Sequence, residues 1–490
     1  MSRPRDPLRR TACAAVLALL PALARAQDAT NASPREGGAR LPPDPRPVDP
    51  SFFERREERG LPPAPSWRDV PAAPPAPSWR DVPAGPPAAR GASESAVDPS
   101  ATPRSGAAPE PGAGPTLQAV GPRTLRVGPD AELRTVAEAA RAARDGDTVE
   151  IAPGEYKGDV AVWNQRRLTI RAAAGGEGGA SGGATGGRPT VRLIAAGAAA
   201  EGKGIWVFRR GEISVEGIEF SGARVSSMNG AGIRIEGGKV TVRDCRFVQN
   251  ENGILVGNNN AIELDIERCQ FVGNGAGDGY SHNLYVGRIA RLSVQSSFFS
   301  AARVGHLLKS RARENLIAYN RLTDDGGGAS YELEIADGGI ATLIGNLIVQ
   351  EADTGNSTIV SYGAESHHWP ENRLTMVNNT VVNRRPTGAV FLRALRAGGE
   401  VVLLNNLWVG SGLVEVRTLA KDAGNAYVEE RSLRAPAKLD FVPREAGALR
   451  AALVDPRSMD LPVPSRQYVH PASSAALGSA PLRLPGAFQR

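Results

Sequence analysis

An internal repeat is the feature that most constrains the fold of this 490-residue chain. Eight short segments align with apolar residues at their first and last positions: VEGIEF, VRDCRF, IERCQF, VQSSFF, IAYNRL, LIGNLI, MVNNTV and LLNNLW. Their spacing varies from 23 residues, between Ser297 and Asn320, to 33 residues, between Asn346 and Asn379. A unit this short cannot bury its apolar face alone, so successive units must stack. The repeat therefore predicts a parallel β-solenoid.

The fourth position of the repeat predicts a ladder of polar side chains at one turn. Stacked asparagine amides can hydrogen-bond from one rung to the next. This column resembles the asparagine ladder of right-handed parallel β-helices such as the pectate lyase superfamily, which implies an all-β, right-handed, single-stranded parallel β-helix. A leucine-rich repeat is the alternative, but these strands are rich in Val and Ile. The column reads Ile218, Cys245, Cys269, Ser297, Asn320, Asn346, Asn379 and Asn406.

The segment from residue 124 to 156 resembles the amino-terminal strand, capping helix and first rung of that superfamily. It reads TLRVGPDAELRTVAEAARAARDGDTVEIAPGEY. The end of a solenoid exposes unpaired strand edges, which must be covered. We expect the amphipathic stretch from Leu133 to Ala143 to form an N-terminal helix that caps this end.

Cys245 and Cys269 occupy the same column on adjacent rungs, and strands in a sheet lie about 4.8 Å apart. In an oxidising compartment the pair could form a disulfide. The demanding geometry of that bond supports the alternative of two small buried thiols. The sequence leaves both states open.

The regions around the repeat predict an exported protein. Residues 1–26 combine an arginine-rich start, a short apolar run and a small-residue ending, which is typical of a secretory signal peptide. Residues 27–118, rich in Pro and Ala, predict a disordered linker in which PPAPSWRDVPA occurs twice. The β-helix domain is expected over residues 119–430, and a C-terminal wrap or cap over residues 431–490.

The composition of the chain indicates which kinds of partner the protein can bind. No later segment is apolar for long enough to span a membrane, so we expect a periplasmic or extracellular protein. The precursor's formal net charge of +6 suits a polyanionic partner. Nucleic acid is not expected, because the chain is exported and has no aromatic-basic binding motif. The oligomeric state is left open.

A second strand precedes the repeat in each rung, and in one rung it reads HLLKS. A lysine facing the apolar interior would carry a large desolvation cost. Side-chain alternation therefore places Leu308 inside and Leu307, Lys309 and Arg311 outside. In the next rung the same rule places Leu333 and Ile335 inside. The outward residues of the flanking rungs are expected to be Asn283, Tyr285, Glu332 and Glu334.

The resemblance to parallel β-helices implies a polysaccharide ligand along this charged face. A uronic-acid chain can be cleaved by β-elimination, in which a base removes the proton at C5. We predict Lys309 as the base, with its pKa lowered by Arg311 and Arg313, and Tyr285 as the acid. The predicted catalytic residues are Lys309, Arg311, Tyr285 and Glu332. The predicted substrate-binding residues are Asn283, His282, His306, Arg313, Tyr331, Glu334 and Arg393.

The cofactor is left unknown, with Ca²⁺ as a candidate because Glu332 and Glu334 offer carboxylate oxygens. The stretch KSRARENLIAYN resembles the Lys-Ser-x-x-Asn strand of chondroitinase B and related alginate lyases through Lys309 and Ser310. This chain departs from that family where Val304 and Gly305 replace its glutamate. A non-catalytic binding or adhesive solenoid is the first alternative. A glycoside hydrolase that uses Glu332 with Glu334 or Asp337 is the second.

Overall fold

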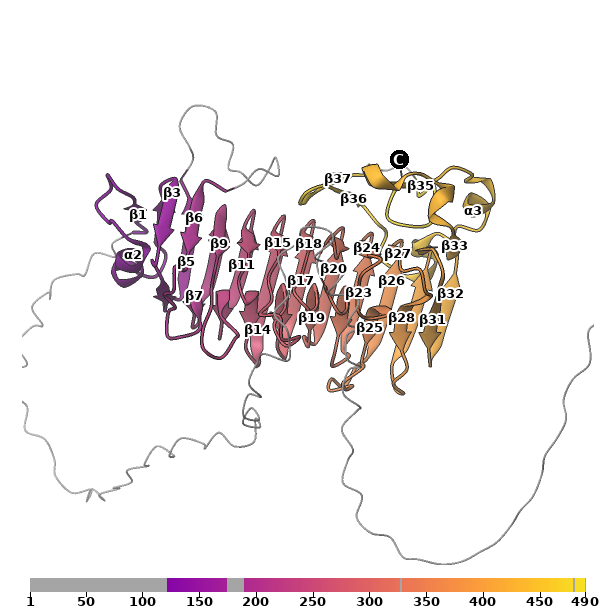
Figure 1. Cartoon of the computed structure of the whole chain (residues 1–490), viewed down its shortest axis with the longest axis horizontal. Coiled ribbons are helices and arrows are strands. Elements are labelled where there is room, and N and C mark those ends of the chain that lie inside the picture. The colour runs from indigo at the N-terminus through magenta and orange to yellow at the C-terminus, as the bar shows by residue number, and fades with distance from the viewer. Residues whose placement is uncertain (1–120, 174–188, 327, 479–480, 490) are drawn as a thin grey trace, which may run out of the picture. The chain divides into compact units, whose positions relative to one another are not determined.

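The computed structural model describes residues 121–173, 189–326, 328–478 and 481–489. The predicted signal peptide and linker lie outside the described residues. The described chain coils through three parallel sheets, which we name A, B and C (Figure 1). It forms a right-handed parallel β-helix, as the repeat predicted. No helix among the described residues is long and apolar enough to cross a membrane.

Each complete rung contributes one strand to each sheet, and each strand pairs in parallel with the equivalent strands of neighbouring rungs. Sheet A contains β1 (Thr124–Val127), β2 (Thr148–Ile151), β5 (Arg167–Ala172), β8 (Glu212–Glu216), β11 (Lys239–Arg243), β14 (Asn259–Glu267), β17 (Ile289–Gln295), β20 (Glu314–Ala318), β23 (Ile340–Ile344), β26 (Arg373–Val377), β29 (Glu400–Leu404) and β32 (Leu419–Ala423). Sheet B contains β3 (Gly154–Lys157), β6 (Val191–Ile194), β9 (Ile218–Ser221), β12 (Arg246–Val248), β15 (Gln270–Val272), β18 (Phe298–Ser300), β21 (Arg321–Thr323), β24 (Leu347–Gln350), β27 (Thr380–Asn383), β30 (Leu407–Val409) and β33 (Ala426–Val428). Sheet C contains β4 (Ala161–Trp163), β7 (Gly204–Phe208), β10 (Ala231–Ile235), β13 (Asn252–Val256), β16 (Leu284–Val286), β19 (Leu308–Ser310), β22 (Leu333–Ile335), β25 (Thr358–Tyr362), β28 (Ala389–Ala394) and β31 (Gly412–Val416).

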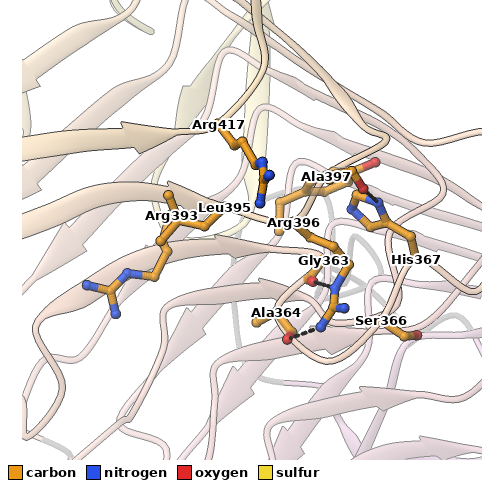
Figure 2. Close-up of a pocket in the computed structure, with 10 residues that line it drawn as sticks. Gly363, Ala364, Ser366, His367, Arg393, Leu395, Arg396, Ala397 and Arg417 are labelled. Carbon is orange, nitrogen blue, oxygen red and sulfur yellow. Dashed lines mark hydrogen bonds between the residues drawn. The ribbon is translucent and has the colours of Figure 1, made fainter. Parts of the chain in front are cut away.

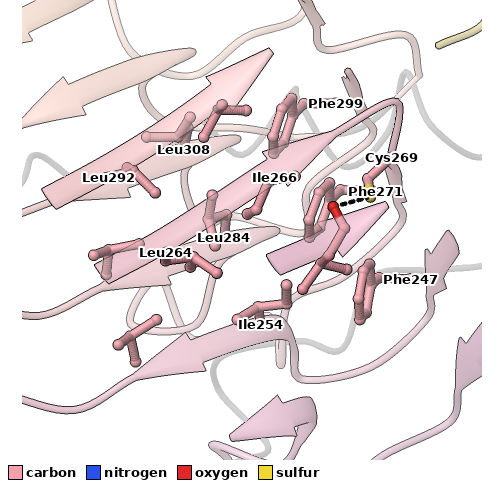
Figure 3. Close-up of a cluster of buried hydrophobic side chains, with 14 of the residues drawn as sticks. Phe247, Ile254, Leu264, Ile266, Cys269, Phe271, Leu284, Leu292, Phe299 and Leu308 are labelled. Carbon is pink, nitrogen blue, oxygen red and sulfur yellow. Dashed lines mark hydrogen bonds between the residues drawn. The ribbon is translucent and has the colours of Figure 1, made fainter. Parts of the chain in front are cut away.

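One interior column of the coil carries phenylalanine in four consecutive rungs. Phe220, Phe247, Phe271 and Phe299 lie face to face in consecutive rungs, with ring centroids 4.6–5.2 Å apart. Figure 3 shows the last three rings of this stack beside the aliphatic core. The last column of the repeat is therefore an interior column, because parallel in-register pairing places equivalent residues above one another.

The asparagine ladder is present at the turn between sheets A and B. From Asn320 onward the buried amide of each rung binds the next rung. Thus Asn346 donates its backbone N–H (3.0 Å) and its Nδ2–H (2.9 Å) to Asn379 Oδ1. Asn379 in turn donates to Leu343 O and Asn406 Oδ1. The ladder ends at Asn425, one rung beyond the predicted column.

We expect Asn379→Ala to lower the free energy of unfolding by about 2–5 kcal/mol, because it leaves buried N–H and C=O groups of two rungs without partners. Urea unfolding followed by circular dichroism measures this change. Asn260→Ala, at an exposed position on sheet A, is the matched control. Equal stabilities of the two variants would contradict a structural role for the ladder.

The N-terminal end carries helix α2 (Val136–Ala142), which begins in a capping box formed by Thr135 and Glu138. The helix buries Val136 and Ala139 in the same core as the coil. A helix therefore lies where the amphipathic stretch predicted one, beside β1 and β4.

The C-terminal segment packs along the outer face of sheet B (Figure 1). Leu433, Phe441 and Phe488 bury themselves against outward residues of β24, β27 and β30. Leu413, at 65 % exposure, lies on the last rung, whose edge is open in the described part of the chain. The segment thus wraps the side of the coil. It contains β34 (Leu433–Ala435), β35 (Asp440–Pro443), β36 (Arg466–Val469), β37 (Ser473–Ala476), α3 (Gly447–Ala451) and the short 3-10 helices η1 (Glu430–Ser432), η2 (Pro436–Lys438) and η3 (Pro456–Met459).

Cys245 and Cys269 are both buried free thiols. Cys269 Sγ lies 3.4 Å from Val242 O, and Figure 3 shows Cys269 within the aliphatic core. Burial raises the pKa of the Cys269 thiol well above its usual range. Of the two states that the sequence left open, the structure has the pair of buried thiols.

Candidate functional site

The outer face of sheet C aligns three predicted site residues on consecutive rungs. Tyr285 pairs with Lys309, and Lys309 pairs with Glu334. Their neighbours Leu308, Leu333 and Ile335 are fully buried inside the coil, as the alternation predicted. The geometry of the sheet therefore places a phenol, an ammonium and a carboxylate in one row.

Lys309 lies between two carboxylates. Its Nζ is 2.8 Å from Glu334 Oε2 and 2.6 Å from Glu365 Oε1. Burial acts to lower the pKa of Lys309, but Glu334 and Glu365 outweigh it and raise the pKa. The expectation of a lowered pKa is wrong, because the nearest charges are anions rather than Arg311 and Arg313. Lys309 is therefore a charged ammonium.

Arg311 connects Tyr285 to Glu365 and to one further carboxylate, that of Asp337. Its Nε donates to Tyr285 Oη at 3.2 Å, Nη1 binds Asp337 Oδ1 at 2.9 Å, and Nη2 binds Glu365 Oε2 at 2.5 Å. Arg288 binds the other oxygen of Asp337 at 2.7 Å. We name the six charged residues the ion-pair cluster: Arg288, Lys309, Arg311, Glu334, Asp337 and Glu365.

The two inner carboxylates of the cluster are ionised. Burial acts to raise the pKa of Glu334, but contacts with His306 and Lys309 lower it to about 2. Burial opposes ionisation of Asp337 too, yet Arg288 and Arg311 lower its pKa. Three cations thus face three anions, and the cluster carries little net charge.

His282 and His306 form a second ladder at the entrance to sheet C. The backbone N–H of His306 donates to His282 Nδ1 at 2.9 Å, and that of Tyr331 donates to His306 Nδ1 at 3.4 Å. Likewise, the backbone N–H of His282 donates to Asn252 Oδ1 of the preceding rung. Burial lowers the pKa of both imidazoles. The two predicted ligand-binding histidines are neutral, buried links between rungs.

Three residues predicted to face outward lie inside the coil. Asn283, Leu307 and Glu332 immediately precede the sheet C strands of consecutive rungs and are fully buried. At this corner the chain bends, so the residue before the strand also points inward. Asn283 joins an interior ladder by accepting hydrogen bonds from Asn274 and donating to Ser300 O. These outward placements are wrong for that reason.

Glu332 is the most unusual of the three. Neither of its carboxylate oxygens has a hydrogen-bond partner among the described residues. Burial raises its pKa well above the usual range, and nearby Asp324 adds to the effect. Burial also raises the pKa of Asp324 to about 8. Glu332 therefore cannot reach a ligand on the outer face, and the structure does not bring it together with Glu334.

The remaining predicted residues lie around the cluster. Tyr331 packs its ring against His306 at 4.9 Å. Arg313 is exposed and pairs with Glu314, away from the ion-pair cluster. Arg393 continues the row of Tyr285, Lys309 and Glu334 beyond Ser361 and pairs with Glu415 at 2.8 Å.

A groove of about 900 Å³ adjoins the cluster on the C-terminal side. We name it the arginine groove, after Arg393, Arg396 and Arg417, which line it with His367 (Figure 2). Arg396 is anchored to the backbone, whereas Arg417 is exposed and has no side-chain partner among the described residues. The groove is therefore the more positive part of this face.

The loop between β25 and β26 separates the groove from the cluster and supplies Glu365. Arg396 donates to the carbonyls of Gly363, Ala364 and Glu365. Trp369 is nearly buried and donates its indole N–H to Arg311 O at 3.1 Å. Trp369 thus anchors the loop to the rung of Arg311.

Sequence reasoning missed Arg288 and Glu365 and treated Asp337 only as a hydrolase candidate. These residues are distant in the sequence: Arg288 lies 23 residues before Arg311, Asp337 lies 26 residues after Arg311, and Glu365 lies 56 residues after Lys309. The 33-residue interval between Asn346 and Asn379 was the available signal for Glu365, because it indicates an inserted loop. No group of three or more metal-ligating side chains is arranged to hold a metal ion within the described residues.

No protein-family model and no curated protein matches the chain. Among solved structures, pectate lyase Pel9A is similar over 76 % of this chain and 97 % of its own, with 12 % identity and a TM-score of 0.45. An alginate lyase from Paenibacillus sp. str. FPU-7 is similar over 61 % of this chain and 99 % of its own, with 14 % identity and a TM-score of 0.41. The chain has a right-handed parallel β-helix fold. At these identities the likeness concerns the course of the chain alone.

Proposed function

We propose that the protein binds an acidic polysaccharide along the outer face of sheet C and cleaves it by β-elimination at the ion-pair cluster. One observation carries the proposal. Lys309 and Arg311 hold a single carboxylate, that of Glu365, next to the Tyr285 hydroxyl. A uronate held in this way would present its carboxylate to two cations.

The roles follow from the charges. In β-elimination the proton leaves C5, its electron pair forms the C4–C5 double bond, and the C4–O bond breaks so that the leaving oxygen gains a proton. Lys309 and Arg311 neutralise the carboxylate and so stabilise the charge that develops at C5. Lys309 is charged and therefore suits this part better than that of the base. Tyr285 is placed to accept the C5 proton on its deprotonated Oη and to return that proton to the leaving oxygen, so that the step balances.

Hydrolysis fits the geometry less well. A glycoside hydrolase needs one carboxyl group that stays protonated near neutral pH to act as general acid. Glu334 and Asp337 are both held ionised by cations. Glu332 has the raised pKa that an acid requires, but it is buried in the interior. A purely adhesive solenoid is the remaining alternative, which the compensated charges of the cluster favour.

Mass spectrometry of the products tests the proposal. The full-length protein is incubated with polygalacturonate, alginate, chondroitin sulfate or hyaluronan, with and without Ca²⁺. β-Elimination yields fragments lighter by one water than those from hydrolysis. Unsaturated fragments from one glycan support the proposal, saturated fragments support the hydrolase, and intact glycan contradicts both catalytic functions.

The arginine groove is expected to bind further acidic groups of the same chain. It lies about three rungs from Lys309, or roughly 14 Å at the usual spacing of strands. We expect Arg417→Gln to weaken binding of the bound glycan about 3- to 10-fold, as one exposed charge pair is lost. Calorimetric titration measures this change. Arg373→Gln, on sheet A, is the control. Equal affinities of the two variants would show that the arginine groove does not bind the glycan.

A further inference from the structure

The Glu365 carboxylate occupies the ion-pair cluster in the manner of a ligand. One oxygen lies 2.6 Å from Lys309 Nζ and the other 2.5 Å from Arg311 Nη2. The Glu365 side chain is 41 % exposed, whereas the second partner of Lys309, Glu334, is 4 % exposed. Lys309 and Arg311 thus each keep one fixed carboxylate partner and share a removable one.

The backbone of the loop is held independently of this carboxylate. Arg396 binds the Gly363, Ala364 and Glu365 carbonyls from the groove side, as Figure 2 shows for the first two. The N–H groups of Glu365 and Ser366 both donate to Ala336 O. The Glu365 side chain can therefore rotate into solvent while the loop stays in place.

Departure of Glu365 leaves a site for one anion. Lys309 still pairs with Glu334, and Arg311 still pairs with Asp337 and Tyr285. The ammonium and the guanidinium each retain an unfilled direction toward solvent. A carboxylate fills both directions with charge-assisted hydrogen bonds, whereas an ester or an amide has no negative charge to offer.

We propose that Glu365 is an internal stand-in for the ligand's carboxylate, and that the site selects unesterified uronate residues, which displace it. This inference rests on the proposed function and names the chemical group that the site recognises. A methyl-esterified chain cannot compete with Glu365, because it would leave two partly buried cations without their anion.

Calorimetric titration of the full-length protein tests this inference, with polygalacturonate, alginate and methyl-esterified pectin as probes. We expect Glu365→Gln to bind polygalacturonate or alginate about 5- to 30-fold more tightly than the unmodified protein, since the competing carboxylate is gone. Methyl-esterified pectin should bind weakly to both. The control is Glu371→Gln, which removes the same charge from the same connection at an exposed position, where the side chain has no partner within the described part of the chain.

The outcomes separate the inference from the proposed function. A gain confined to Glu365→Gln supports the inference, even where the unmodified protein binds too weakly to measure. Binding of the acidic glycan by the unmodified protein without a gain in Glu365→Gln overturns the inference and leaves the proposed function standing. Equal gains in both variants reveal a general charge effect and also overturn it. Absence of binding in every variant overturns both.

Discussion

Replacing Lys309 by glutamine is expected to slow formation of unsaturated product about 100- to 1,000-fold, the usual loss when one preorganised electrostatic group is removed. The reason is the position of the ammonium. It lies beside the only carboxylate of the ion-pair cluster that is substantially exposed, so it would contact the ligand carboxylate directly. Initial rates by ultraviolet absorbance of the product measure the change.

Two controls separate chemistry from stability in this experiment. Lys239→Gln removes an exposed lysine that pairs with Glu263 on sheet A and should retain full activity. Lys309→Gln leaves the buried carboxylate of Glu334 without its ammonium, which can destabilise the fold. The double variant Lys309→Gln/Glu334→Gln removes both charges. Recovery of activity in the double variant would show that Lys309 acts through stability and not through the ligand.

Replacing Glu332 by leucine is expected to stabilise the protein by about 1–4 kcal/mol at neutral pH, the range found when buried charged groups are exchanged for apolar ones. Glu332 lies at an interior position that the adjacent rungs fill with Leu307 and Ile359, and its carboxylate oxygens accept no hydrogen bond from the described residues. Chemical unfolding of both proteins measures the difference. A lower stability of the leucine variant would contradict an uncompensated carboxyl group.

The gain from Glu332→Leu should grow with pH. A carboxyl group whose folded pKa is raised destabilises the fold as pH rises above its unfolded pKa, by about 1.4 kcal/mol per unit. For each such carboxyl group the destabilisation begins near pH 4 and continues up to its folded pKa. For the neighbouring Asp324 that pKa is about 8. Asp324→Asn should likewise reduce the loss of folding stability that accompanies rising pH.

The buried histidines act with the opposite sign. Burial lowers the pKa of His282 and His306, so their contribution is complete above the unfolded value near 6.5 and is lost as pH falls. The stability of the unmodified protein therefore combines two opposing slopes. The difference in free energy of unfolding between the unmodified protein and Glu332→Leu isolates the contribution of the Glu332 carboxyl group. A difference that is constant from pH 4 to pH 8 would contradict a raised pKa of Glu332.

The sequence predicted those parts of the fold that repeat from rung to rung. The phenylalanine column and the asparagine ladder recur at fixed positions, so one alignment located them. The residues before Asn379 and Asn406 are themselves asparagines with φ near +51° and +54°. Asparagine tolerates this left-handed conformation, which the turn between sheets A and B requires.

The inward and outward assignments failed where the rung turns a corner. Alternation is valid within a strand, and it placed Leu308, Lys309 and Leu333 correctly. The residues before those strands lie at a bend, so Asn283, Leu307 and Glu332 point inward as well. Hydrophobicity signalled this for Leu307, but the amide of Asn283 and the carboxyl of Glu332 gave no such signal.

The sequence indicated the cations of the site but not the anions that pair with them. Lys309 and Arg311 stand out because they interrupt an apolar strand. Their anionic partners Glu365 and Asp337 come from other rungs and from an inserted loop, and only the three-dimensional stacking brings them within contact distance. The pKa of Lys309 depends on these partners, which explains why its predicted direction was wrong.

The most direct test of β-elimination at the ion-pair cluster is the ultraviolet absorbance of unsaturated uronate product, recorded for the unmodified protein, Lys309→Gln and Lys239→Gln on the same acidic glycans. We expect a steady rise with the unmodified protein and with Lys239→Gln on at least one glycan, and a rise at least about 100-fold slower with Lys309→Gln. Equal rates for all three proteins, or no product from any glycan, would contradict β-elimination at this cluster.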